Sequence, residues 1–316
     1  MPPLTLDDAR QNPHDPGSDA AGERATAVER AATEPLIAPG GATIRIGTAS
    51  WTDPTMTAPG VFYPRGFVGA EERLTYYADT FPIVEVDATY YALPSARVAA
   101  AWVDRTPPDF VFDAKAHALM TGQPTETKRL PKDLRAALPA DLAARPRMYA
   151  RDLPAELRDE LWRLYRAGLE PLRASGQVGS VLLQFPKWFF PTGESRDLIL
   201  EARQRLEGIM SAVEFRSPAW FNEKNLERTL SFLADHSIPL VMVDGPQGLR
   251  SSVPPLTVVT SSQLAVIRFH GAGSRPGRQP GFLRSSGSAI STARPRCKSG
   301  CRASVRRPQR LGRCIS

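Results

Sequence analysis

The stretch Ser211–Phe221 reads SAVEFRSPAWF, and the placement of its charges is the starting point for predicting the fold. A short apolar start leads to Glu214 and Arg216, and the segment ends at a Ser-Pro pair. Because side chains along a strand alternate between its two faces, Glu214 and Arg216 share one face, and Val213 and Phe215 share the other. We therefore predict a buried strand with a polar face near its carboxyl end.

Five other predicted strands repeat this arrangement. Their polar residues near the carboxyl end are Glu85 and Asp87, Asp113 and Lys115, Gln184, Asp244, and Arg268 and His270. In a barrel of parallel strands the outer face meets helices and is apolar, whereas the inner face near the carboxyl ends holds the site. We expect these polar residues to meet there, although the first strand, Ile44–Gly47, does not show the pattern.

Strands alternate with helices along the chain. The predicted strands are Ile44–Gly47, Pro82–Asp87, Phe110–Lys115, Ser180–Phe185, Ser211–Arg216, Pro239–Asp244 and Leu264–His270. The predicted helices are Glu71–Thr80, Ser95–Arg105, Pro154–Ser175, Ser195–Leu206 and Asn225–His236. This order predicts a parallel α/β sheet, and seven strands within about 230 residues favour a TIM (β/α)8-type barrel. No glycine-rich nucleotide-binding turn follows the first strand, which argues against a doubly wound sheet.

The net charge of +7 is unevenly distributed along the 316 residues. Eleven of the 40 lysines and arginines lie from Arg275 onward, where there is no Asp or Glu, which leaves 29 basic against 33 acidic residues before it. The body of the chain is therefore mildly acidic, which argues against nucleic acid as its partner.

Composition divides the chain into a folded domain between two irregular ends. We predict a disordered extension over residues 1–42, a barrel domain over 43–274, and a basic, low-complexity tail over 275–316. Within the barrel, the Pro-rich and basic segment 116–152 is predicted to be an insertion over one end of the fold.

The sequence favours a cytoplasmic protein that is not inserted in a membrane. All three cysteines, Cys297, Cys301 and Cys314, lie in the tail, so the body has no disulfide framework. The N-terminal residues lack the basic and apolar regions of a signal peptide, and no apolar run reaches the roughly 18 residues of a membrane span.

A series of motifs resembles a known family. In chain order they are IRIGTASW, FYP, VEVDATYYALP, FDAKA, VLLQFP, AVEFRSPAWF, VMVD and VIRFHG. Together they resemble the YecE-like family, domain of unknown function 72, over about residues 44–271. The resemblance implies a TIM barrel and leaves the reaction open, because no biochemical activity is established for that family.

The resemblance stops after Gly271. Residues 272–316 show neither strand alternation nor a helical period, and their Arg, Ser, Gly and Pro content is typical of GC-rich DNA translated in the wrong frame. We hypothesise a frameshift near Gly271–Ser274, with a natural basic tail or a diverged terminus as alternatives. A barrel without its last β/α unit would leave two open strand edges, so we expect this chain to fold poorly.

The leading functional hypothesis is an enzyme, such as a hydrolase, lyase or isomerase, that acts on a small phosphorylated or sugar-like anion. We expect acid–base work from Glu214, Asp244 and His270. Substrate binding is expected from Arg216, Arg268, Lys115, Gln184, Glu85 and Asp87. A version that uses Mg²⁺ or Mn²⁺ would take its ligands from Glu85, Asp87, Glu214, Asp244 and His270.

Other hypotheses stay open. The same charges would also suit a buried ion-pair network without chemistry, or a non-catalytic barrel that holds a small anion. Nucleic-acid binding is the weakest alternative, and it would use the aromatic residues Trp51, Tyr90, Tyr91, Trp188 and Trp220 near the loops. A defunct, truncated family member is the last alternative. The sequence does not specify the oligomeric state.

Overall fold

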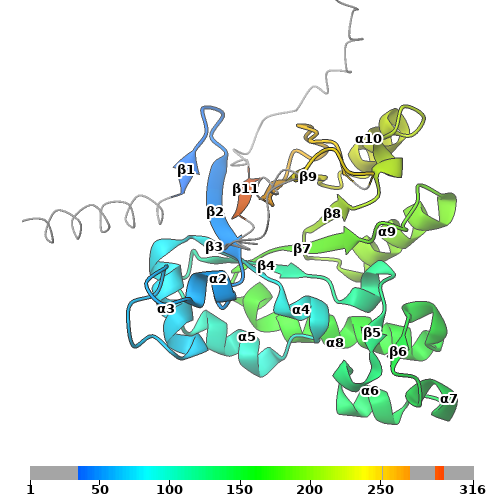
Figure 1. Ribbon diagram of the computed structural model, residues 1–316, viewed down its shortest axis with the longest axis horizontal. Coiled ribbons are helices and arrows are strands. Elements are labelled where there is room, and N and C mark those ends of the chain that lie inside the picture. The colour runs from blue at the N-terminus through cyan, green and yellow to red at the C-terminus, as the bar shows by residue number, and fades with distance from the viewer. Residues whose placement is uncertain (1–34, 251, 271–288, 295–316) are drawn as a thin grey trace, which may run out of the picture.

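The computed structural model describes residues 35–250, 252–270 and 289–294, which form a mixed α/β fold around a curled sheet (Figure 1). All seven predicted strands are confirmed. They are β2 (Thr43–Ala49), β3 (Ile83–Val86), β4 (Val111–Lys115), β7 (Val178–Phe185), β8 (Ser211–Phe215), β9 (Val241–Asp244) and β10 (Ala265–Phe269). The strand order is β8-β7-β4-β3-β2-β11-β10-β9, where β11 is Ala289–Arg294.

Most neighbours in this sheet are parallel, as the alternation of strands and helices predicted. The sheet curls so that its two end strands approach each other. Between them, Val213 of β8 forms an isolated parallel bridge with Leu240, which directly precedes β9. The carboxyl ends of the parallel strands are thereby brought to one end of a curved surface.

The predicted helices are also present, and they follow the outer side of the sheet (Figure 1). They are α3 (Ala70–Thr80), α5 (Ala96–Val103), α8 (Ala155–Ala174), α9 (Gly193–Arg205) and α10 (Leu226–Asp235). Short helices α2 (Pro54–Thr57) and α4 (Ala88–Tyr91) lie in loops. On α8, Leu161, Tyr165 and Leu169 are fully buried, because this amphipathic helix turns one apolar stripe toward the sheet.

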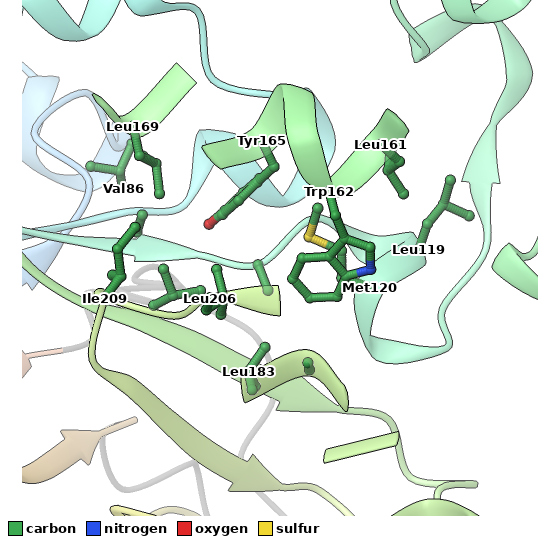
Figure 2. Close-up of a cluster of buried hydrophobic side chains, with 14 of the residues drawn as sticks. Val86, Leu119, Met120, Leu161, Trp162, Tyr165, Leu169, Leu183, Leu206 and Ile209 are labelled. Atoms are coloured by element: carbon green, nitrogen blue, oxygen red, sulfur yellow. The ribbon is translucent and has the colours of Figure 1, made fainter. Parts of the chain in front are cut away.

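The main hydrophobic core lies between the outer face of the sheet and these helices. Figure 2 shows part of it, where Leu169 of α8 lies beside Val86 of β3. The outer-facing residues Val213 and Phe215 belong to the same core. The predicted alternation is therefore confirmed for β8: its apolar residues pack outward.

The inner face carries an apolar layer with a polar layer above it. A second buried cluster contains Leu182, Ala212 and Val266. Two residues further along the same strands come Gln184, Glu214 and Arg268, which therefore face the same side, and all three are buried. The strand period of two thus places the polar layer inside the curled sheet, nearer the carboxyl ends.

Asp244 departs from the predicted pattern. On β9 the residues that pack with the inner cluster are Val241 and Val243, so the strand alternation turns Asp244 to the other face, where it is exposed. In the described part of the chain no helix follows β9; a loop from Gly245 leads toward β10. Met242 on that same face is buried, so the face is covered further back along β9, and Asp244 is exposed only because it stands at the end of the strand.

The N-terminal boundary of the fold also differs from the prediction. Residues 1–42 were expected to be disordered, but Leu36–Ile37 forms strand β1, antiparallel to β2. Strand β3 pairs only with Thr48 and Ala49 of β2, so the backbone at the start of β2 is left for an extended segment, whose side chains can stay in solvent. The rest of that prediction, over residues 1–34, lies outside the described residues.

The expectation of two open strand edges is wrong. Strand β11 lies between β2 and β10 and pairs antiparallel with both, with Ile290 opposite Gly47 and Arg268. The sequence shows no eighth parallel strand after a crossover helix. The backbone groups at the facing edges of β2 and β10 can, however, also form hydrogen bonds with an antiparallel segment. The remainder of the predicted tail, residues 275–288 and 295–316, lies outside the described residues.

The predicted insertion contains several short elements and a small sheet of its own. These are η1 (Ala118–Thr121), β5 (Thr125–Glu126), η2 (Thr127–Arg129), α6 (Lys132–Ala136), α7 (Ala140–Ala143), β6 (Arg147–Met148) and η3 (Ala150–Asp152). Strands β5 and β6 pair antiparallel, apart from the main sheet. In Figure 1 they lie at the lower right, with α6 and α7, beyond one end of α8.

Candidate functional site

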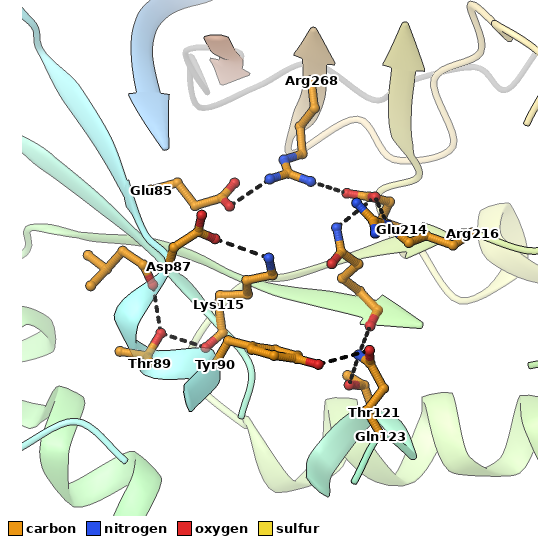
Figure 3. A network of polar contacts seen from close by, with 12 residues as sticks. Glu85, Asp87, Thr89, Tyr90, Lys115, Thr121, Gln123, Glu214, Arg216 and Arg268 are labelled. Atoms are coloured by element: carbon orange, nitrogen blue, oxygen red, sulfur yellow. Dashed lines mark hydrogen bonds and ion pairs between the residues drawn. The ribbon is translucent and has the colours of Figure 1, made fainter. Parts of the chain in front are cut away.

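A buried arginine joins two buried carboxylates across the inner face of the sheet (Figure 3). Arg268 of β10 donates from Nη1 to Glu214 Oε2 at 2.6 Å and from Nη2 to Glu85 Oε1 at 2.8 Å. All three residues are at most 2% exposed. The structure therefore brings together strands β3, β8 and β10 through one charged bridge, as the common polar face predicted.

Glu214 receives two further donors. Gln184 Nε2 donates to Glu214 Oε1 at 2.8 Å, and Arg216 Nε lies 3.5 Å from the same oxygen. Although burial alone would raise the pKa of Glu214, the charges of Arg268 and Arg216 outweigh it and hold the pKa below the ordinary value. Glu214 is therefore an ionised acceptor that orients its neighbours and is a weak base.

Glu85 has a different environment. Burial raises its pKa to about 8, the attraction of Arg268 opposes this, and the neighbouring carboxyl of Asp87 adds to it. Asp87 lies beside Lys115, whose Nζ donates to Asp87 Oδ1 at 3.0 Å. Burial would raise the pKa of Asp87, but Lys115 and the hydrogen bond with Glu85 lower it. At neutral pH, Glu85 thus holds a proton and Asp87 does not.

His270 stands at the exit of β10, next to the bridge. Its backbone N–H donates to Asp244 O at 2.9 Å, which joins the ends of β10 and β9. Partial burial and the positive charge of Arg268 lower the pKa of His270. The imidazole is therefore neutral at pH 7 and able to accept a proton.

A cavity of about 340 Å³ opens beside Glu214. Its polar lining includes Glu214, Arg216, Lys187 and His270, and its apolar lining includes Val243, Pro246, Leu249 and Val253. The Arg216 side chain is 46% exposed, whereas that of Arg268 is 3% exposed. The cations that can reach a ligand are therefore those at the rim, and Arg268 is enclosed between its carboxylates.

The candidate metal ligands are not gathered at one point. Across residues 35–250, 252–270 and 289–294 there is no group of three or more His, Cys, Asp or Glu side chains placed to hold a metal ion. At the centre of the site, the contacts of Arg268 explain why Glu85 and Glu214 do not form a metal site. Glu85 and Glu214 each direct a carboxylate oxygen at the Arg268 guanidinium, which supplies the positive charge between them.

Two residues of the site were not assigned to it from the sequence: Lys187 was not named, and Tyr90 was named only for nucleic-acid binding. Lys187 lines the cavity from the loop that follows β7, and its place directly after the motif VLLQFP was a usable signal. Tyr90 covers Lys115, with Nζ 5.2 Å from its ring centroid, and its hydroxyl donates to Gln123 Oε1 at 2.9 Å. Gln123 in turn donates to the Gln184 carbonyl, a link that spans 61 residues and that no local pattern shows.

The aromatic residues that nucleic-acid binding would need differ in their exposure to solvent. Trp220 is completely buried and stacks on Phe215, with ring centroids 4.0 Å apart, so it cannot stack on a base. Trp51 is largely buried, and its indole N–H donates to the Ala70 carbonyl. Trp188 and Tyr91 are exposed. Trp220 thus supports the outer core behind β8.

No helix in the part of the chain that the structure describes combines the length and the apolar character needed to cross a membrane.

Comparison with known proteins places the chain among relatives without an assigned activity. The sequence profile of the family described as "Protein of unknown function DUF72" matches residues 45–297, a span that includes β11. A Bacillus subtilis (strain 168) protein named UPF0759 protein YunF is 29% identical over 237 residues, which are 75% of this chain and 73% of that protein.

Solved structures agree with this match. A DUF72 family protein from Thermotoga maritima MSB8 superimposes with a TM-score of 0.53 at 26% identity, over 74% of this chain and 77% of the other. A DUF72 family protein from Enterococcus faecalis V583 gives a TM-score of 0.52 at 26% identity, over 64% and 71% of the two chains.

Proposed function

The chain belongs to the DUF72 family, whose function is unknown, and on this premise we propose that it is an enzyme that performs acid–base chemistry on a small organic anion. The reaction would take place at the carboxyl ends of the parallel strands, where parallel barrels place their sites. The observation that carries this proposal is the cavity in which Arg216, Lys187 and His270 surround the ionised Glu214.

In this proposal the two rim cations bind the anionic group. Arg216 is partly exposed, and Glu214 Oε1 holds its Nε at 3.5 Å, which leaves the other face of the guanidinium for a phosphate or carboxylate. Lys187 lines the same cavity and is exposed. The apolar side of the cavity, with Val243 and Leu249, would contact the uncharged part of the substrate.

His270 is the proposed proton acceptor. It lines the cavity, and its lowered pKa leaves the imidazole neutral at pH 7, as a general base requires. Arg268, Glu85 and Gln184 are proposed as positioning residues, since they contact Glu214 or Arg268 in the buried bridge. Lys115 and Asp87 are proposed to complete the polar surface beside Tyr90.

We further propose that the curled sheet is a complete barrel. The bridge between Val213 and Leu240 and the position of β11 between β2 and β10 support closure of the sheet on itself. Closure would enclose the bridge residues and so maintain the low dielectric that raises the pKa of Glu85.

The alternative is a non-catalytic protein that holds an anion in the same cavity. Such a binder needs the cations but has no use for a carboxyl group with a strongly raised pKa or a neutral histidine beside the ligand. The position of His270 in the lining of the cavity favours the enzyme. The two hypotheses differ in whether the bound compound is converted.

The test is a panel of phosphorylated sugars and small carboxylic acids, incubated with the protein and followed by proton and phosphorus NMR. We expect at least one compound to be converted, and the variant His270→Asn to bind it while turnover falls by about 10²–10⁴-fold, the usual contribution of a general base. Arg216→Gln should instead weaken binding. Compounds that bind to the wild-type protein but are never converted would favour the binder.

A further inference from the structure

The insertion contains a second basic cavity, separate from the cavity beside Glu214. Its volume is about 600 Å³, within the range of small-molecule sites. It is lined by Glu126, Thr127, Lys128, Arg135, Leu138, Ala143, Arg145, Pro146 and Arg147. None of these residues lines the cavity beside Glu214, so the two cavities can be tested independently.

The lining combines four cations with one carboxylate. Lys128 Nζ lies 3.2 Å from Glu126 Oε2, and Arg145 Nη2 lies 3.3 Å from Asp141 Oδ2 outside the cavity lining. Arg135 and Arg147 are exposed, and neither has an ion pair with any residue that the structure describes. Two of the four cations are therefore available to an anionic ligand without breaking an existing pair.

The cavity has a fixed frame. Strands β5 and β6 place Glu126 and Arg147 of its lining opposite each other. Thr127 N donates to the Pro146 carbonyl at 3.0 Å, and the Thr127 hydroxyl donates to the Arg145 carbonyl. Buried leucines, Leu134 of α6 and Leu142 of α7, hold the short helices on either side. The cations are thus presented by anchored elements, which lowers the entropic cost of ordering them around a ligand.

Charge determines the class of ligand. Residues 1–274 carry a net negative charge, so a group of cations in a concave surface is an exception that concentrates positive potential. Guanidinium groups bind phosphate oxygens in pairs of parallel hydrogen bonds, and several cations around one cavity match several phosphates better than one carboxylate. We propose that the cavity framed by β5, β6, α6 and α7 is a binding site for a compact oligophosphate.

Isothermal titration calorimetry with inorganic tripolyphosphate tests this site on the full chain. We expect one-site binding that survives replacement of the buffer anion by sulfate at equal ionic strength. The double variant Arg135→Gln/Arg147→Gln should bind about tenfold or more weakly, because two charge-assisted contacts are lost. Circular dichroism should show an unchanged fold, since both side chains are exposed.

A matched control distinguishes binding in this cavity from non-specific electrostatic attraction of tripolyphosphate to the chain, including attraction to the basic residues after Arg275. Arg65 and Arg228 are also exposed and line none of the cavities described above, so Arg65→Gln/Arg228→Gln removes the same charge elsewhere. It should leave the affinity within about twofold, as distant exposed charges are screened. Equal weakening in both double variants, or no binding to the wild-type chain, would overturn the proposal.

Discussion

The two carboxylates that share Arg268 behave in opposite ways. On the β8 side, Glu214 accepts hydrogen bonds from Arg268 and Gln184 and lies near Arg216, so its pKa is lowered. On the β3 side, Glu85 shares Arg268 but lies next to the carboxyl of Asp87, and its pKa rises to about 8. Both are equally buried, so their charged neighbours and donors, and not their depth, separate their pKa values.

This difference suggests a division of roles, in which Glu214 serves the proposed reaction and Glu85 serves the stability of the fold. The β8 side opens onto the cavity with its rim cations, whereas Glu85 lines none of the cavities described here. We infer that the proton on Glu85 reduces the negative charge that Arg268 must balance, so that the guanidinium is directed mainly to Glu214. The predictions below test that division.

The largest effect is expected from removing the shared cation. Arg268→Met leaves Glu214 ionised in a buried site with only Gln184 and the more distant Arg216 as donors. We expect the free energy of unfolding in urea to fall by about 3–5 kcal/mol at pH 7, the usual cost of breaking a buried ion pair. The triple variant Arg268→Met/Glu85→Gln/Glu214→Gln also removes the unbalanced charge of Glu214, and it should regain a large part of this loss.

The next largest loss of stability is expected from breaking the pairing between β11 and β10, the strand that carries Arg268. Its second neighbour is β11, and Ile290→Pro removes a backbone N–H in the middle of that strand. We expect a loss of about 3 kcal/mol in unfolding free energy, together with earlier hydrogen exchange in β2 and β10. Ile290→Val keeps the N–H and is the control. Equal stability of the proline variant would show that β11 does not support the sheet.

A smaller effect distinguishes the two carboxylates directly. Near pH 6, Glu214→Gln should cost about 1.5–3 kcal/mol, because charged hydrogen bonds are lost. Glu85→Gln should cost less than about 1 kcal/mol there, since Glu85 is already protonated and glutamine has a similar shape. Urea unfolding of the three proteins measures both values.

The raised pKa of Glu85 also predicts how the stability of the protein depends on pH. The pKa of Glu85 is about 8 in the folded state against 4.5 as its ordinary value, so between these pH values the folded state holds a proton that the unfolded state has lost. Wild-type stability should therefore decline relative to Glu85→Gln as pH rises from 5 to 8, on the order of 1.4 kcal/mol per pH unit, and the difference should stop growing above pH 8. A constant difference over this range would contradict the raised pKa.

The sequence predicted the main fold because local signals agreed with one another. Period-two alternation on β7 and β8 and the helical period of α8 each fixed which side meets the core, and they led to the Arg268 bridge. Asp244 was misplaced because a polar residue at a strand end was assumed to face inward, although such a residue can equally be exposed on the outer face where the strand ends. The two contacts that Arg268 makes with Glu214 and Glu85 span 54 and 183 residues, and no local pattern carries them.

The segment after Gly271 shows the limit of such patterns most clearly. Its composition predicted no strand, yet β11 pairs by its backbone with two neighbours whose edges face each other. We keep the reading-frame hypothesis as a proposal that DNA sequencing from Leu264 to the stop codon decides. An alternative frame that encodes a helix and an apolar strand would support it, and a single open frame would contradict it.

The smallest effect on stability, and the one that links the comparison to function, is expected for Arg216. Its side chain is 46% exposed, and its contact with Glu214 is long at 3.5 Å, so Arg216→Gln should change the unfolding free energy by less than about 1 kcal/mol. Its effect should appear in binding instead, as an affinity for the converted or bound anion about tenfold weaker. Arg228→Gln is the matched control, because it removes an exposed arginine that does not line the cavity. If Arg216→Gln destabilised the fold as strongly as Arg268→Met and left affinity unchanged, then both arginines would serve the structure, and the cavity beside Glu214 would lose its proposed role.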